Sequence, residues 1–61
     1  MNAEQAVTLA ESKKGLQAIL IQGMHVVAGD KATQKAESRG VEFSRLYRHE
    51  GKIVAIQNYD R

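Results

Sequence analysis

The chain has 61 residues, 43% of them hydrophobic, with no cysteine and a formal net charge of +2. That length allows one small domain, residues 1–61. In so short a chain, the free energy gained by burying apolar side chains is nearly cancelled by the entropy lost on ordering the chain. No disulfide can add stability, and no cluster of ligand residues predicts a structural metal. We therefore expect a single domain that forms a homodimer or higher oligomer, or completes its folding on a partner.

The charge is unevenly distributed along the chain. Residues 1–30 carry two cationic and three acidic side chains, a net charge of −1, whereas residues 31–61 carry seven and four, a net charge of +3. The C-terminal half is thus the candidate surface for an acidic partner, and the basic residues of 31–52 could contact nucleic acid.

The N-terminus lacks the pattern of a signal peptide, and the longest apolar run, residues 18–21, is too short to span a bilayer. We expect a cytoplasmic protein that does not enter a membrane.

The first segment has the signals of a helix. Asn2 is a good N-cap, and Gln5 stands three residues later at capping-box spacing. Apolar residues then keep helical phase as far as Leu20. We favour one helix from about Ala3 to Gln22. An alternative ends the helix at Lys14 and makes residues 16–22 a strand.

Two shorter segments follow. Residues 24–28, Met-His-Val-Val-Ala, lie between glycines and include a β-branched pair, which is typical of a short strand. Residues 30–39 are polar and contain no large apolar side chain. Asp30 could cap a short solvent-facing helix that ends before Gly40, and a flexible loop is the alternative.

Residues 40–59 have the period of two that is typical of a β-hairpin, with the turn around His49–Lys52. Gly51 supplies the positive φ that a tight turn requires. The second strand, Ile53–Ile56, is apolar on both faces, as a strand covered on both sides would be. The sequence therefore predicts an α+β fold, in which an N-terminal helix packs on a small, three-stranded antiparallel sheet that ends in a C-terminal β-hairpin.

Residues 33–48 can also be read with helical period. Ala36 stands four positions before Gly40, and Val41 and Leu46 follow it, so that this segment resembles the helix-turn-helix family. Residues 46–56 also look like the recognition helix and wing of small excisionase-type proteins. The resemblance implies a second helix over Val41–Glu50 and DNA binding, with the groove and phosphate contacts made by Glu42, Phe43, Arg45, Arg48 and Lys52.

The residues that carry chemistry are few and scattered. His25 and His49 have no cysteine or spaced acid that would complete a metal site. The serines lack the paired base or strained turn that a nucleophile requires, and the five glycines are too dispersed for a phosphate loop. We expect neither an enzyme nor a bound metal or cofactor.

Binding is therefore the function that the sequence favours. Tyrosine and arginine are enriched at interface hot spots. The candidate partner-binding residues gather around the hairpin: Arg45, Tyr47, Arg48, His49, Lys52 and Tyr59. We expect a small non-enzymatic protein that modulates or inhibits a larger protein through its C-terminal hairpin, as phage and mobile-element proteins of this size do. The alternatives are a DNA-binding transcriptional regulator that uses residues 33–48, and a structural subunit of an oligomeric assembly.

Overall fold

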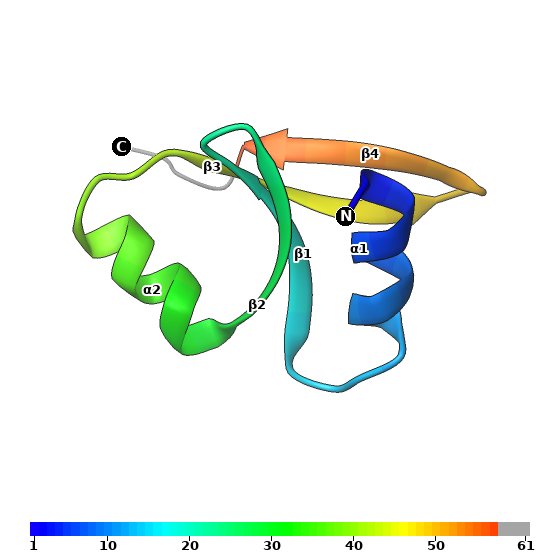
Figure 1. Ribbon diagram of the computed structural model, residues 1–61, viewed down its shortest axis with the longest axis horizontal. Helices are drawn as coiled ribbons and strands as arrows, with labels where there is room; N and C mark the ends of the chain where they lie inside the picture. The colour runs from blue at the N-terminus through cyan, green and yellow to red at the C-terminus, as the bar shows by residue number, and fades with distance from the viewer. Residues whose placement is uncertain (58–61) are drawn as a thin grey trace.

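The structure is a computed structural model that describes residues 1–57, and it confirms the α+β fold (Figure 1). A four-stranded sheet with the order β2-β1-β3-β4 is antiparallel at every pairing. The C-terminal strands form the expected hairpin. The elements in chain order are α1 (Ala3–Glu11), β1 (Leu16–Ile21), β2 (Met24–Gly29), α2 (Asp30–Ser38), β3 (Phe43–His49) and β4 (Lys52–Gln57).

The start of α1 is as predicted, but its end is not. The Asn2 side chain accepts a hydrogen bond from the Gln5 backbone N–H at 2.8 Å, and the Gln5 side chain accepts one from the Asn2 N–H at 2.9 Å. This pair of bonds is the capping box. The favoured helix to Gln22 is wrong, because α1 ends at Glu11 and residues 16–21 form β1. As a central strand, β1 gains hydrogen bonds from two neighbours, which outweigh the helical phase of its apolar residues.

The sheet has four strands and not three, because residues 16–21 form a hairpin with β2. Its two-residue turn, Gln22–Gly23, has φ values of 50° and 78°. The predicted C-terminal hairpin turns in the same way at Glu50–Gly51, with φ values of 52° and 78°. Two positive φ values in succession are typical of a type I′ turn, whose twist matches that of the strands it joins.

Residues 30–38 form the helix that was one of two expectations for this segment, although its N-cap is Gly29 and not Asp30. After the helix, Gly40 has a φ of 75°. Its N–H donates a hydrogen bond to the Glu37 carbonyl, and the Val41 N–H donates one to the Ala36 carbonyl. These two bonds form a Schellman motif, which ends the helix. The chain then runs into β3, so the second helix implied by the helix-turn-helix resemblance is wrong.

The two helices lie on opposite faces of the sheet, on the two sides of β1 and β2 in Figure 1. α1 covers the face that includes Ala18 and Leu46, which form the core with Ala6 and Val7. α2 lies against the other face, where Gln17 Nε2 of β1 donates to the buried Thr33 hydroxyl at 3.2 Å. Because α2 contacts mainly β2, the hairpin beyond the buried Phe43 has no helix over that second face within residues 1–57.

A substitution at Glu50 tests the assignment of the turn in the C-terminal hairpin. Glu50 occupies the left-handed region, which asparagine adopts with less strain than glutamate. We expect Glu50→Asn to raise the free energy of unfolding by roughly 1 kcal/mol. Urea denaturation followed by circular dichroism at one fixed protein concentration measures it. Glu42→Asn removes the same charge at a residue without positive φ and should leave stability unchanged; equal values for both variants would contradict the turn assignment.

Candidate functional site

The β3–β4 hairpin presents two faces with different surroundings. Arg45, Tyr47 and His49 alternate along β3 and point away from α1, since their neighbour Leu46 belongs to the core under α1. Their partners on β4 are Ile56, Val54 and Lys52, in that order. Residues paired in an antiparallel ladder share a face. We call this set the open hairpin face: Arg45, Tyr47, His49, Lys52, Val54 and Ile56.

The centre of the open hairpin face is apolar and accessible. Ile56 is 53% exposed and Tyr47 is 38% exposed. Val54, directly opposite Tyr47, is partly buried. The rings of Tyr47 and His49 meet edge to face, with centroids 6.5 Å apart and planes at 70°. This packing orients the tyrosine ring on the face.

Cationic side chains border this apolar centre. Arg45 and Lys52 are both exposed and lie at its two ends, opposite Ile56 and His49 respectively. Glu50 in the turn lies next to the face, with its carboxylate 3.8 Å from His49 Nε2. The face therefore combines an aromatic and aliphatic centre with a net positive rim, and it is complementary to an apolar patch bordered by acids.

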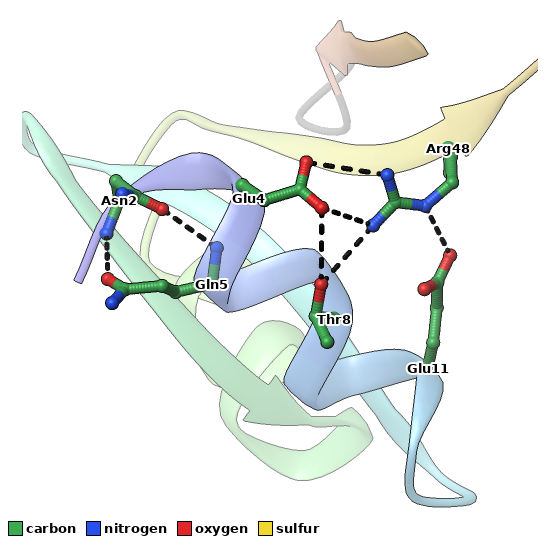
Figure 2. Close-up of polar contacts among 6 residues, drawn as sticks. All are labelled: Asn2, Glu4, Gln5, Thr8, Glu11 and Arg48. Carbon is green, nitrogen blue, oxygen red and sulfur yellow. Dashed lines mark hydrogen bonds and ion pairs between the residues drawn. The ribbon is translucent and has the colours of Figure 1, made fainter. Parts of the chain in front are cut away.

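Four of the six predicted site residues thus come together, and Arg48 does not join them. Arg48 lies on the other face of β3 and reaches α1 (Figure 2). Its Nη2 donates to Glu4 at 2.9 Å and to the Thr8 hydroxyl at 3.3 Å, and its Nε donates to Glu11 at 3.2 Å. The guanidinium therefore fastens the hairpin to α1. The sixth residue, Tyr59, lies outside the described residues.

The Arg48 cluster shifts the pKa values of its members. The hydrogen bond from Arg48, with its positive charge, lowers the pKa of Glu4 below its usual value. In return, the hydrogen bond to Glu4, followed by that to Glu11, raises the pKa of Arg48. Both groups are ionised at neutral pH, and the ion pair forms at the surface, where solvent screening weakens it.

Sequence reasoning missed two members of the open hairpin face. Val54 and Ile56 were assigned to a strand covered on both faces, but Ala55 and Ile56 are exposed and β4 is an outer strand of the sheet. The signal was present in the period of two: a turn at residues 50–51 pairs Tyr47 with Val54 and Arg45 with Ile56. Applying that register to the sequence would have placed both residues beside Tyr47.

A hollow of about 340 Å³ lies between α1 and the end of the sheet where β1 and β3 separate. Pairing between these strands ends at Ala18 and Leu46, so Leu16 and Arg48 are not bridged. The hollow is lined by residues from α1 and both strands, including Val7, Glu11, Gln17, Arg45 and Tyr47. Arg45 and Tyr47 of the open hairpin face contribute to its lining.

The comparisons with known proteins are negative: no family model, no curated protein and no solved structure matches the chain. Within residues 1–57, no group of three or more metal-ligating side chains is close enough together to hold an ion. Neither helix of that part of the chain has the length and apolar character needed to cross a bilayer. The function must therefore be argued from the geometry of the open hairpin face.

The pH dependence of unfolding tests the Arg48 cluster. Because the folded state lowers the pKa of Glu4, this ion pair adds stability above the unfolded pKa of Glu4 and loses it as the pH falls through the lowered folded value. We expect the melting temperature of the wild type to fall in this acidic range, and that of Glu4→Gln to fall less. Thermal melts followed by circular dichroism from neutral pH to about pH 3 cover the range.

The matched control is Glu42→Gln, which removes an exposed carboxylate outside the cluster. Its melting temperature should follow the wild-type pH curve. A Glu4→Gln curve parallel to the wild type over the whole range would show that Arg48 does not stabilise the folded state through Glu4.

Proposed function

We propose that this chain is a non-enzymatic binding protein that modulates a larger protein by covering part of its surface with the open hairpin face. The observation that carries the proposal is the exposure of Tyr47 and Ile56 side by side with Arg45 on a face that neither helix covers. Exposed apolar side chains gathered into one patch and rimmed by polar ones are typical of a protein-interaction surface.

The residue types support a protein partner. Tyrosine and arginine supply most of the energy at hot spots, where an aromatic ring enters a pocket and a guanidinium pairs with a carboxylate. The rigid sheet keeps this surface preorganised, which limits the entropy lost on binding. The partner that fits is a protein with an apolar pocket for Tyr47 and acidic side chains near Arg45 and Lys52.

The DNA-binding alternative has less support. The helix that would enter the groove is replaced by β3, and Arg48 is bonded to Glu4 and Glu11. The other basic side chains of residues 31–52 are divided between α2 and the hairpin, without the helix that the resemblance implied. Net charge alone then favours DNA binding, and a net positive surface suits an acidic protein partner equally well.

The test is binding by matched surface variants. Proteins captured by the wild type are identified by mass spectrometry, and the recurrent one is titrated with purified variants by calorimetry. We expect Tyr47→Ala to weaken binding at least tenfold, about 1.4 kcal/mol, because it removes the ring at the centre of the face. Arg45→Ala should weaken it less and reduce its dependence on salt.

Leu9→Ala is the control, since Leu9 is a similarly exposed apolar side chain on α1. It should bind as the wild type does. Circular dichroism and melting temperature confirm that each variant is folded, which is expected because Tyr47 is not part of the core under α1. Equal affinities for Tyr47→Ala and the wild type, or a larger loss with Leu9→Ala, would refute the open hairpin face as the binding surface.

A further inference from the structure

Within residues 1–57, β4 is an outer strand with few of the features that protect sheet edges. Its pairing with β3 runs without a bulge from Lys52 to Gln57, and the chain contains no proline. The one charge on β4 is Lys52, at the turn end. The segment between Lys52 and Gln57 is Ile-Val-Ala-Ile. All four residues are uncharged, and three of them are β-branched. Natural edges are usually blocked by charges, proline, bulges or a covering segment, and an unprotected apolar edge invites another strand to pair with it.

The turn fixes which backbone groups face outward. His49 and Lys52 flank a two-residue turn, which makes them a hydrogen-bonded pair, and such pairs recur at every second residue. Val54 and Ile56 therefore direct their N–H and C=O groups toward β3. Ile53, Ala55 and Gln57 direct theirs away from the sheet, and these are the groups available to another strand.

We propose that the partner of this edge is a second copy of the chain, with β4 pairing antiparallel to β4 of the copy about a two-fold axis at Ala55. In this register Val54 lies opposite Ile56 of the copy, and Ile53 lies opposite its Gln57. The β-branched side chains of the open face thus pair with one another across the strands. The two Lys52 residues fall outside these pairs, at opposite ends of the ladder.

Self-pairing fits the edge better than pairing with an unrelated strand. The segment is neutral between Lys52 and the end of β4, so an antiparallel copy brings no like charges together. A two-fold axis through Ala55 sets the smallest side chain of the strand opposite its own copy at the centre of the ladder. The other outer strand, β2, is less accessible, because α2 begins at the residue after it and packs on it.

The size of the core gives a second reason. Only six apolar side chains are buried in the described residues, and two of these are alanines. A domain this small commonly gains stability from oligomerisation. Joining the two β4 edges would form a continuous eight-stranded sheet, with both α1 helices on one face and both open hairpin faces on the other. The inference rests on the edge of β4 and does not depend on the proposed partner of the open face.

Amide hydrogen exchange measured by NMR at several concentrations tests the pairing without a mutation. Exchange at Ile53 and Ala55 should slow as the protein becomes more concentrated, because dimerisation bonds their N–H groups. Exchange at Val54 should stay protected throughout, since its N–H is already bonded to β3. Sedimentation equilibrium over the same range should show the mass rise from 6.8 kDa toward twice that value. A protein that stays monomeric up to about millimolar concentration would overturn the proposal.

Charged substitutions of Ala55, which lies at the proposed two-fold axis, test where the two copies meet. Ala55 is exposed in the single chain, so Ala55→Lys and Ala55→Glu should fold, yet each should self-associate at least about tenfold more weakly because like charges meet at the axis. An equimolar mixture of the two should form the heterodimer. Gln34→Lys adds the same charge on the exposed part of α2 and should dimerise as the wild type does. Unchanged dimers of both Ala55 variants would overturn the assignment to β4.

Ala55→Cys serves if the charged variants do not fold. A short bifunctional thiol reagent should join two chains through this position, since directly opposed residues of a hydrogen-bonded pair have Cα atoms about 5.5 Å apart. Absence of the cross-link in a folded, associating protein would overturn the two-fold axis at Ala55. Because none of these measurements uses an external partner, their failure is distinguishable from failure of the proposed function.

Discussion

The fold depends on the burial of β1 from both faces. Its side chains alternate across the sheet, and Ala18 on one face and Ile19 on the other are 1% and 4% exposed. An antiparallel sheet can leave one face in water, but a central strand that is apolar on both faces cannot. One helix must therefore cover each face. α1 covers the face of Ala18, and α2 lies on the face of Ile19, where Gln17 donates a hydrogen bond to Thr33.

This constraint explains which parts of the fold could be read from the sequence. The capping box at Asn2, the strand over residues 24–28 and the C-terminal hairpin were predicted because each has a local signature. Residues 16–21 have none, since an apolar run covered on both faces fits a helix and a strand equally well. The clue to a hairpin was the Gln22–Gly23 pair, which repeats the turn at Glu50–Gly51. Residues 16–21 are more stable as a strand only when both neighbouring strands pair with them.

The candidate site was predictable to the extent that it is local. A period of two places Arg45, Tyr47 and His49 on one face, and the turn brings Lys52 beside them. The same period puts Arg48 on the opposite face, but it does not reveal what Arg48 contacts. Its partners Glu4 and Glu11 lie 44 and 37 residues away in the sequence. An arginine that supports the fold and one that awaits a partner look alike until the helix is placed against the sheet.

The topology also explains why the other face of the hairpin is open. β3 is held by its pairing with β1 and by Leu46 in the core under α1, and Arg48 adds a contact to α1. The hairpin therefore keeps its place without a second helix over Tyr47 and Val54. α2 cannot reach that region, since the chain enters it directly from β2 at the far edge of the sheet. The order β2-β1-β3-β4 thus separates the two apolar surfaces of the hairpin. The surface under α1 belongs to the core, and the surface around Tyr47 stays accessible because the topology provides nothing within residues 1–57 to cover it.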